Sequence, residues 1–484
     1  MATQKLPSIK KNFFYNTLYQ ILILITPFIT APYLSRVLGA DKIGLYSYTY
    51  SIAFYFLLFC SLGTVSYGAR EISRTRDDKE LRSKLFFEIE LLTIFTSSIS
   101  LIFWIIYIIC NPSYKQINCI YIISILSSML NISWFFTGLE NFKSIVTKNS
   151  IVKISGIILI LLLVKKPEDL WIYILIVVSA DFLGNVSMWL SLKKYIVKID
   201  FHSINIWPHF KETLVYFIPS IASSIYLVLD KTLIGIITQD NSQNGFYEEA
   251  NKIIGIVKTL CFSSITSVMG SRTSYLYKEN KIDEIKLKIE QTLDFILFMS
   301  IGSCFGLIGV ANNFVPFFFG ETFKPSIILL QLMSPTVIII SISILMCNLY
   351  FVPAGLRKKS CFFEISGAVL NLLLNIILIY NFKSAGAVIA TICAEFLISA
   401  LYVIFSDKFL TLSIIIKYSW KKIISASLML IYLLLLNKIN FPSYLVALVV
   451  QISGGSLIYV ITLLILKDSN IFRIYRKIFK RKKK

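Results

Sequence analysis

The chain has 484 residues, 56% of them hydrophobic, and its mean hydropathy is +0.73. A soluble domain of this length would show alternating polar faces and longer polar loops, so the composition excludes soluble classes and indicates a polytopic membrane protein. The net charge of +21 would suggest a nucleic-acid partner for a soluble protein. In a membrane protein its placement along the chain decides its meaning.

Apolar runs of about 20 residues recur along the whole chain, which favours an all-α helical bundle over a β-barrel with weak alternating segments. The runs predict about 14 transmembrane helices. They lie near residues 13–35, 43–64, 85–109, 114–136, 145–164, 170–192, 211–237, 246–270, 287–310, 324–351, 360–380, 384–406, 418–437 and 442–466. The loops between them are short, so we expect no inserted soluble catalytic domain.

The basic residues alternate between the two sides of this predicted topology. The N-terminus, the even-numbered loops and the C-terminal tail together carry about 37 Lys and Arg residues, whereas the odd-numbered loops carry about 8. Cytoplasmic loops are enriched in Lys and Arg, so the pattern predicts that both termini are cytoplasmic. The first apolar run is longer than a signal-peptide core, and we expect it to be an uncleaved span.

The predicted spans divide naturally into six, six and two. We expect an N-terminal lobe at residues 1–200, a C-terminal lobe at 201–410, two further helices at 411–466 and a basic cytoplasmic tail at 467–484. The second span opens with Ile43–Ile52 and the eighth with Asn244–Ile253, and these segments share Gly, Tyr and Ile in register. This internal similarity, between segments six spans apart, favours a parallel repeat about an axis along the membrane normal.

Charged residues inside the seventh and eighth spans, between Pro219 and Tyr275, form the main candidate site. A charge near the bilayer centre costs roughly 2.5–3.5 kcal/mol, so such residues usually face a water-filled interior or a partner. These residues predict a polar cavity between helices, which is typical of a transporter. They are Asp230, Lys231, Glu248, Glu249, Lys252 and Lys258.

Two interpretations of the outer part of this charged set are open. Glu248 and Glu249 precede Lys252 at helical spacings from which either carboxylate can reach the ammonium group. Asp230 and Lys231 are adjacent and point about 100° apart, so they do not satisfy one another side by side. The set forms either the wall of a cavity in which ion pairs open and close, or a static ion-pair lock between helices.

Lys258 lies about 18 Å from the inner end of its span, which is too deep for its side chain to reach the interface. It needs a carboxylate, a water-filled cavity or an anionic substrate, and Asp181 and Glu395 fall at a similar depth. Arg272 follows the eighth span at the inner face. There a contact at the cavity mouth and an ordinary positive-inside anchor are both open.

Four segments, spread in order over the first twelve predicted spans, carry a family resemblance. They are APYLSRVLGADKIGLYSY (Ala31–Tyr48, which includes Arg36), WFFTGLENFK (Trp134–Lys143), LDKTLIG (Leu229–Gly235) followed by GFYEEANKI, and the segment Gly367–Phe396 with Asn371, Asn375 and Glu395. Together they resemble the bacterial polysaccharide-repeat flippases (Wzx type) of the multidrug/oligosaccharidyl-lipid/polysaccharide exporter superfamily. The chain departs from that pattern at Met269-Gly270-Ser271-Arg272, where many members carry Pro-Arg.

The resemblance implies two six-helix lobes around a central cavity, with two peripheral helices. It implies alternating access that carries an undecaprenyl-pyrophosphate-linked oligosaccharide, an O-antigen or capsule repeat unit, from the inner to the outer leaflet of the bacterial inner membrane. The polyprenyl tail would stay in lipid while the head group enters a cationic cavity. The candidate cations are Lys231, Lys252, Lys258, Arg272 and Arg36.

The resemblance implies a transporter without a cofactor, a catalytic residue or a metal site. Coupling to H⁺ or Na⁺, or gating by ion pairs, would involve carboxylates within the spans. The candidates are Asp230, Glu248, Glu249, Glu395 and Asp181. Besides the lipid-linked oligosaccharide and membrane lipids, a polysaccharide polymerase and a chain-length regulator are candidate partners; nucleic acid is not.

Two other functions compete with this hypothesis. A cation-coupled drug antiporter of the same superfamily would have a net acidic cavity, whereas the deep charges here include three lysines. A membrane enzyme such as a polysaccharide polymerase would be expected to carry a large external loop. His202 and His209 share one inner loop, without the Cys or acid spacing of a metal site.

Overall fold

The computed structural model describes residues 9–279 and 281–471. Within these residues, the side chains of 9–16, 142–145, 218–220, 222–227, 263–272 and 274 lie outside the description. The side chain of Arg272 and most of the predicted basic tail are therefore not described. The described part of the chain is helical and contains no strand.

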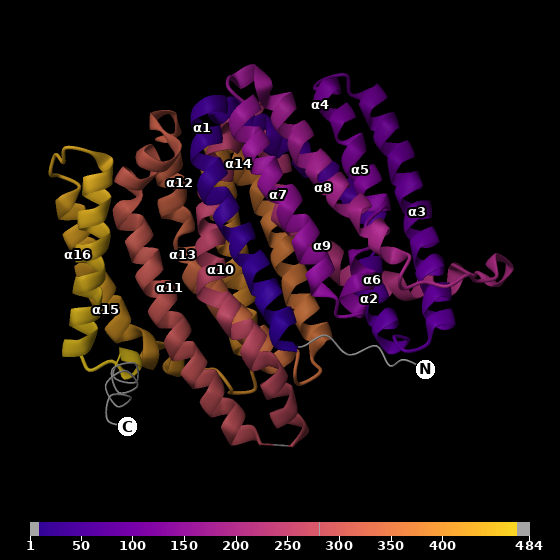
Figure 1. The fold of residues 1–484 in the computed structure, drawn as a ribbon. Coiled ribbons are helices and arrows are strands. Elements are labelled where there is room, and N and C mark those ends of the chain that lie inside the picture. Colours follow the sequence, from indigo (N-terminus) through magenta and orange to yellow (C-terminus); the bar gives the residue numbers. More distant parts are fainter. Residues whose placement is uncertain (1–8, 280, 472–484) are drawn as a thin grey trace. The chain divides into compact units, whose positions relative to one another are not determined.

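Sixteen α-helices follow one another in the described residues (Figure 1). They are α1 (Ile9–Ser61), α2 (Thr64–Arg74), α3 (Lys79–Cys110), α4 (Lys115–Ile120), α5 (Ile122–Met129), α6 (Ser133–Gly138), α7 (Phe142–Leu163), α8 (Leu170–Leu192), α9 (Trp207–Thr238), α10 (Asn241–Lys278), α11 (Ile282–Phe319), α12 (Ser326–Met333), α13 (Pro335–Met346), α14 (Arg357–Ile404), α15 (Leu412–Leu436) and α16 (Tyr444–Ile465). Short 3₁₀ turns lie at Pro167–Asp169, Phe201–Ser203 and Glu321–Phe323, and a π-helical turn at Cys347–Phe351 follows α13.

Ten helical stretches in the described part of the chain are long and apolar enough to cross a membrane. Two of them, of 58 and 48 residues, far exceed the ~20 residues that a span needs. Each contains a backbone break, at Gly39 (φ 72°) in α1 and at Lys383 (φ 53°) in α14. Both breaks fall where two predicted spans adjoin. The polytopic all-α class is confirmed, and the exact number of fourteen spans stays a prediction.

The chain forms two compact units, one up to Thr232 and the other from Leu233 onward. The boundary falls within α9, so most of this helix groups with the first unit. The lobe boundary predicted from the sequence lies at residue 200. The assignment of residues 1–200, 201–410 and 411–466 to two lobes and a peripheral pair stays a prediction.

The first unit has an aromatic core where α2, α3 and α6 meet. Trp134, Phe135 and Phe136 of the WFFTG segment are almost fully buried, and Trp134 stacks on Phe86 with ring centroids 5.7 Å apart. Gly68 of α2 lies against Trp134, because a Cβ at this position would be 2.5 Å from the Trp134 Cε3 atom. This family-like motif therefore builds the core of the first unit.

The second unit packs α11 along both α15 and α16 (Figure 1). Small residues on α11 allow the close approach: a Cβ on Gly302 would lie 2.8 Å from the Tyr459 ring, and one on Gly309 would lie 2.5 Å from Leu433. Such small-residue contacts are typical of helix packing in membranes, where dispersion and not water exclusion drives association.

Gly386 is the tightest of these contacts, and we expect it to tolerate no side chain. A Cβ there would lie 2.1 Å from the carbonyl oxygen of Leu378, on the other side of the break at Lys383. Because backbone must shift to make room, Gly386→Ala should destabilise the protein by about 1–3 kcal/mol. Thermal unfolding of the purified protein in detergent, followed by tryptophan fluorescence, measures the change.

Gly255→Ala is the matched control, since a Cβ at Gly255 meets nothing within 4 Å. It should be neutral or slightly stabilising, because alanine is the better helix former. Equal destabilisation by the two substitutions would contradict the close approach at Gly386.

Candidate functional site

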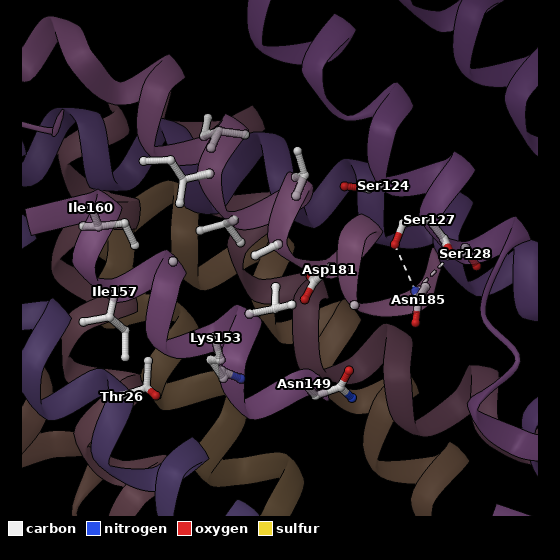
Figure 2. A pocket seen from close by; sticks show the side chains of 18 of the residues that line it. Thr26, Ser124, Ser127, Ser128, Asn149, Lys153, Ile157, Ile160, Asp181 and Asn185 are labelled. Carbon is white, nitrogen blue, oxygen red and sulfur yellow. Dashed lines mark hydrogen bonds between the residues drawn. The ribbon is translucent and has the colours of Figure 1, made fainter. Parts of the chain in front are cut away.

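A cavity of about 600 Å³ lies inside the first unit, lined mainly by α1, α5, α7 and α8 (Figure 2). Both arms of α1 contribute, with Tyr19, Thr26 and Thr30 before the break at Gly39 and Tyr46, Tyr50 and Leu57 after it. The cavity therefore straddles the break in the first helix.

The lining of this cavity is unusually polar for the interior of an apolar bundle. Its hydroxyl and amide side chains come from all four helices, from the residues on either side of α5 and from the start of α6. They are Tyr19, Thr26, Thr30, Tyr46, Tyr50, Tyr121, Ser124, Ser127, Ser128, Asn131, Ser133, Asn149, Tyr173 and Asn185. A polar group without a hydrogen-bond partner costs free energy in such surroundings, so this lining fits water or a hydroxyl-rich ligand.

Four of the tyrosines form a connected cluster. Tyr46 stacks on Tyr50, with ring centroids 5.8 Å apart, and meets the Tyr173 ring edge to face at 5.1 Å. The Tyr50 ring is also 6.2 Å from that of the buried Tyr121. Tyr46 and Tyr50 lie on α1, Tyr173 lies on α8, and Tyr121 directly precedes α5. Together they give one side of the cavity a set of aromatic faces.

Amide and hydroxyl groups fix another side of the cavity. The Asn185 side-chain nitrogen of α8 donates to both the carbonyl oxygen and the Oγ atom of Ser127, each at 3.0 Å. Figure 2 shows these groups facing the cavity beside Ser128. This tether holds α5 and α8 at a fixed separation.

Lys153 of α7 and Asp181 of α8 are the charged groups among the described lining residues. The two interact electrostatically, and Figure 2 shows both near Asn149. Asp181 is exposed to the cavity, and Lys153 is half-buried. The sequence analysis offered Asp181 as a partner for Lys258; within its own unit Asp181 has Lys153 as its neighbour. Lys153 was not among the predicted site residues.

In the second unit, α10 carries the predicted lysine and its carboxylates. The Lys252 Nζ atom is 2.9 Å from Glu249 Oε1 and 3.8 Å from Glu248 Oε1. Both carboxylates are buried, whereas the lysine side chain is 29% exposed. The lysine side chain is therefore partly accessible, and two buried acidic groups lie beside its ammonium group.

Lys258 lies further along α10 and interacts electrostatically with Glu395 of α14. Both side chains are half-buried. Glu395, one of the two carboxylates that the sequence placed at this depth, lies in the same unit as Lys258.

Asp230 and Lys231 lie near the end of the first unit, on α9. Asp230 is buried beside Tyr55 of α1, and Lys231 is half-buried. The next residue, Thr232, shares hydrogen bonds with Ser51 at 2.8 Å and Tyr55 at 3.1 Å between side-chain oxygens. These bonds attach α9 to the second arm of α1.

Arg36 is exposed on the first arm of α1, and its Nη1 atom donates to the carbonyl oxygen of Pro32 at 3.0 Å. Arg272 belongs to α10, but its side chain lies outside the described residues. The predicted residues thus form three local groups, and the roles assigned to them stay predictions. These groups are Lys252 with Glu248 and Glu249, Lys258 with Glu395, and the neighbours Asp230 and Lys231.

A family model described as "Polysaccharide biosynthesis protein" matches residues 9–269, more than half of the chain. The chain belongs to this family. The similarity that the four sequence motifs suggested, to the polysaccharide-repeat flippases, is thereby confirmed.

Two similar proteins are each described as "Putative O-antigen transporter". That of Shigella dysenteriae is 26% identical over 80% of this chain and 98% of its own length. That of Escherichia coli (strain K12) is 25% identical over 84% of this chain and 98% of its own length. The relatives are described as transporters, and the chain has many helices long and apolar enough to span a membrane. The chain is therefore a multi-pass membrane transporter and not an enzyme.

The fold resembles a solved structure of the lipid II flippase MurJ in an inward closed conformation. The TM-score is 0.72 at 18% sequence identity, over 94% of this chain and 98% of that one. At this sequence identity the structural similarity establishes the fold and does not identify the transported substrate.

One buried ion cluster escaped the sequence analysis. The Lys422 Nζ atom of α15 is 2.6 Å from Asp294 Oδ1 of α11 and 3.0 Å from Asp468 Oδ2, which follows α16. All three side chains are at most 3% exposed. The available signal was a lysine and an aspartate lying inside two apolar runs, which is costly unless they are paired.

We expect this cluster to stabilise the attachment of α15 and α16 to α11. Lys422→Met would leave two buried carboxylates without their ammonium partner, so it should cost about 3–5 kcal/mol of unfolding free energy. Adding Asp294→Asn to Lys422→Met should recover part of that loss. Chemical or thermal unfolding in detergent measures both variants.

Lys421→Met is the control, because the Lys421 ammonium donates to the carbonyl oxygen of Lys467 and lies over the Trp420 ring at the surface. It should change stability by no more than about 0.5 kcal/mol. A loss equal to that of Lys422→Met would contradict the assigned role of the cluster.

Proposed function

We propose that the protein is a flippase for an undecaprenyl-pyrophosphate-linked oligosaccharide, an O-antigen or capsule repeat unit. It moves this cargo from the inner to the outer leaflet of the bacterial inner membrane by alternating access, with both termini cytoplasmic. The names of the two O-antigen transporters, which align over almost their whole length, support this class of cargo.

The observation that carries the proposal is the placement of two lysines beside carboxylates within the long helix α10. Lys252 and Lys258 stand in α10 next to carboxylates and keep part of their surface exposed. A diphosphate cannot cross hydrocarbon unaided, because the loss of its hydration costs too much free energy. Lysines in a wet cavity replace that hydration.

The neighbouring carboxylates give each lysine an alternative ion-pair partner when no cargo is bound. Without cargo, Glu249 and Glu395 neutralise Lys252 and Lys258; with cargo, the diphosphate oxygens take their place. A binding site of this kind releases its cargo readily, because the acidic groups compete for the same ammonium groups. Strong binding would only slow transport.

The remaining predicted residues extend this proposal. Lys231, Arg36 and Arg272 are further cations for the head group. Ion pairs of Asp230, Glu248, Glu249, Glu395 and Asp181 gate the transporter or bind H⁺ or Na⁺ that drives it. A polysaccharide polymerase and a chain-length regulator would receive the translocated repeat unit.

Removing the lysines should slow translocation. A hydrogen bond to a charged group contributes about 1.5–3 kcal/mol, so Lys252→Ala and Lys258→Ala should each lower the rate by roughly 10- to 100-fold. The measurement uses liposomes that contain the purified protein and an undecaprenyl-pyrophosphate-linked oligosaccharide, and it follows the fraction that becomes accessible on the far side.

Lys258→Arg keeps the charge and should retain most of the rate at equal protein content. Full translocation by both alanine variants would overturn the proposed role of the lysines. Faster transport of an organic cation by the alanine variants, with no transport of the oligosaccharide, would favour a drug antiporter instead.

A further inference from the structure

The cavity of the first unit carries an inference that deepens the proposed function and rests on it. We propose that this cavity is a saccharide site, which takes uncharged pyranose rings of the cargo while the diphosphate binds lysines elsewhere in the protein. None of the lysines proposed above to hold the diphosphate is among its described lining residues.

The size of the cavity suits part of a glycan. Its volume of about 600 Å³ lies within the ~300–1,000 Å³ typical of small-ligand pockets. Pockets of this kind are mostly lined by apolar residues with a few polar groups. Here Ser, Asn and Tyr side chains occur at every lining helix, so the ligand must offer many hydroxyl groups.

The chemistry of the lining matches both faces of a sugar ring. A pyranose presents apolar C–H faces and a rim of hydroxyl groups that both donate and accept hydrogen bonds. Tyrosine rings supply flat apolar surface with a polar end, and the cluster of Tyr46, Tyr50, Tyr121 and Tyr173 supplies several such faces. Serine hydroxyls and asparagine amides donate and accept in turn.

The charge of the lining selects against an anionic or cationic ligand. Lys153 and Asp181 offset one another, so the described lining carries no net charge. A diphosphate or an acidic sugar that pairs with Lys153 would be repelled by Asp181, and an organic cation that pairs with Asp181 would be repelled by Lys153. An uncharged sugar hydroxyl can instead donate to Asp181 and accept from Lys153, in charge-assisted hydrogen bonds.

The first test measures binding to the full chain in lipid nanodiscs by saturation-transfer-difference NMR. The probes are methyl β-D-glucopyranoside and methyl N-acetyl-β-D-glucosaminide, with methyl β-D-glucuronide as the charged probe of the same ring. We expect saturation transfer to the ring protons of either or both uncharged probes and a markedly weaker signal for the glucuronide. Absence of signal for both uncharged probes, or equal signal for the glucuronide, would overturn the proposal.

Gly156 of α7 provides a matched pair of variants, because it lines the cavity and no side chain is removed. A Cβ at this position would lie 3.7 Å from the Ala180 Cβ atom and 3.9 Å from the Ile176 Cγ2 atom, which is ordinary contact. Gly156→Ala should therefore bind the probes like the unmodified protein. Gly156→Phe fills the cavity and should abolish binding.

A second pair tests the aromatic faces. Tyr46→Leu should weaken probe binding by about tenfold, since it removes the ring shared by two aromatic contacts. Tyr380→Leu is the control, because Tyr380 is an exposed residue of α14 in the other unit. Unchanged binding in both Gly156→Phe and Tyr46→Leu, at unchanged thermal stability, would place the sugar outside this cavity.

Translocation of the lipid-linked oligosaccharide by the same proteins separates the two proposals. Active translocation without any probe binding would overturn the saccharide site and leave the flippase function standing. Lys258→Ala should translocate roughly 10- to 100-fold more slowly but keep probe binding. Binding of tetraphenylphosphonium in place of the sugars, blocked by Gly156→Phe, would assign the cavity to organic cations and overturn both.

Discussion

The structure depends on one constraint: a polar group that faces hydrocarbon without a hydrogen-bond partner costs several kcal/mol. In a helix, the backbone N–H and C=O groups bond to one another, so the backbone satisfies this constraint. Side chains meet it in two ways, by pairing charges within buried clusters or by gathering around a cavity that can hold water and ligand. The cluster of Lys422 with Asp294 and Asp468 takes the first way, and the lining of the cavity in the first unit takes the second.

These two solutions serve different ends. The Lys422 cluster has almost no exposed surface and joins α15 to α11. Its charges therefore stabilise helix packing and are not accessible to a ligand. Lys252 has the same kind of partners but remains partly exposed on α10. The two ion pairs therefore differ in exposure, and the proposed exchange of a carboxylate for cargo is assigned only to the exposed one.

Hydropathy and helical spacing were enough to predict much of this molecule. Most apolar runs fall on helices, and the breaks in α1 and α14 fall between neighbouring predicted spans. However, α2 lies almost entirely outside the runs, and the run at 114–136 covers α4, α5 and most of α6. The pairing of Lys252 with Glu248 and Glu249 followed from spacing along one helix, because such contacts are local.

The missed features all depend on contacts between segments that are distant in the chain. Tyr46, Tyr121 and Tyr173 look like ordinary interfacial tyrosines in the sequence, and only the packing of their helices gathers them around one cavity. Likewise Lys422 and Asp294 are 128 positions apart. Periodicity within a single segment carries no information about such pairs.

The break at Gly39 determines how the first helix surrounds the cavity. Its left-handed backbone conformation suits glycine, and the space beside it is open, since a Cβ there would meet no atom within 4 Å. The arms on either side are rigid helices that both contribute to the cavity wall. Any change in the angle between intact arms must therefore be absorbed by the few torsions around this residue. Gly39 is therefore the point at which the two cavity-lining arms of α1 change direction.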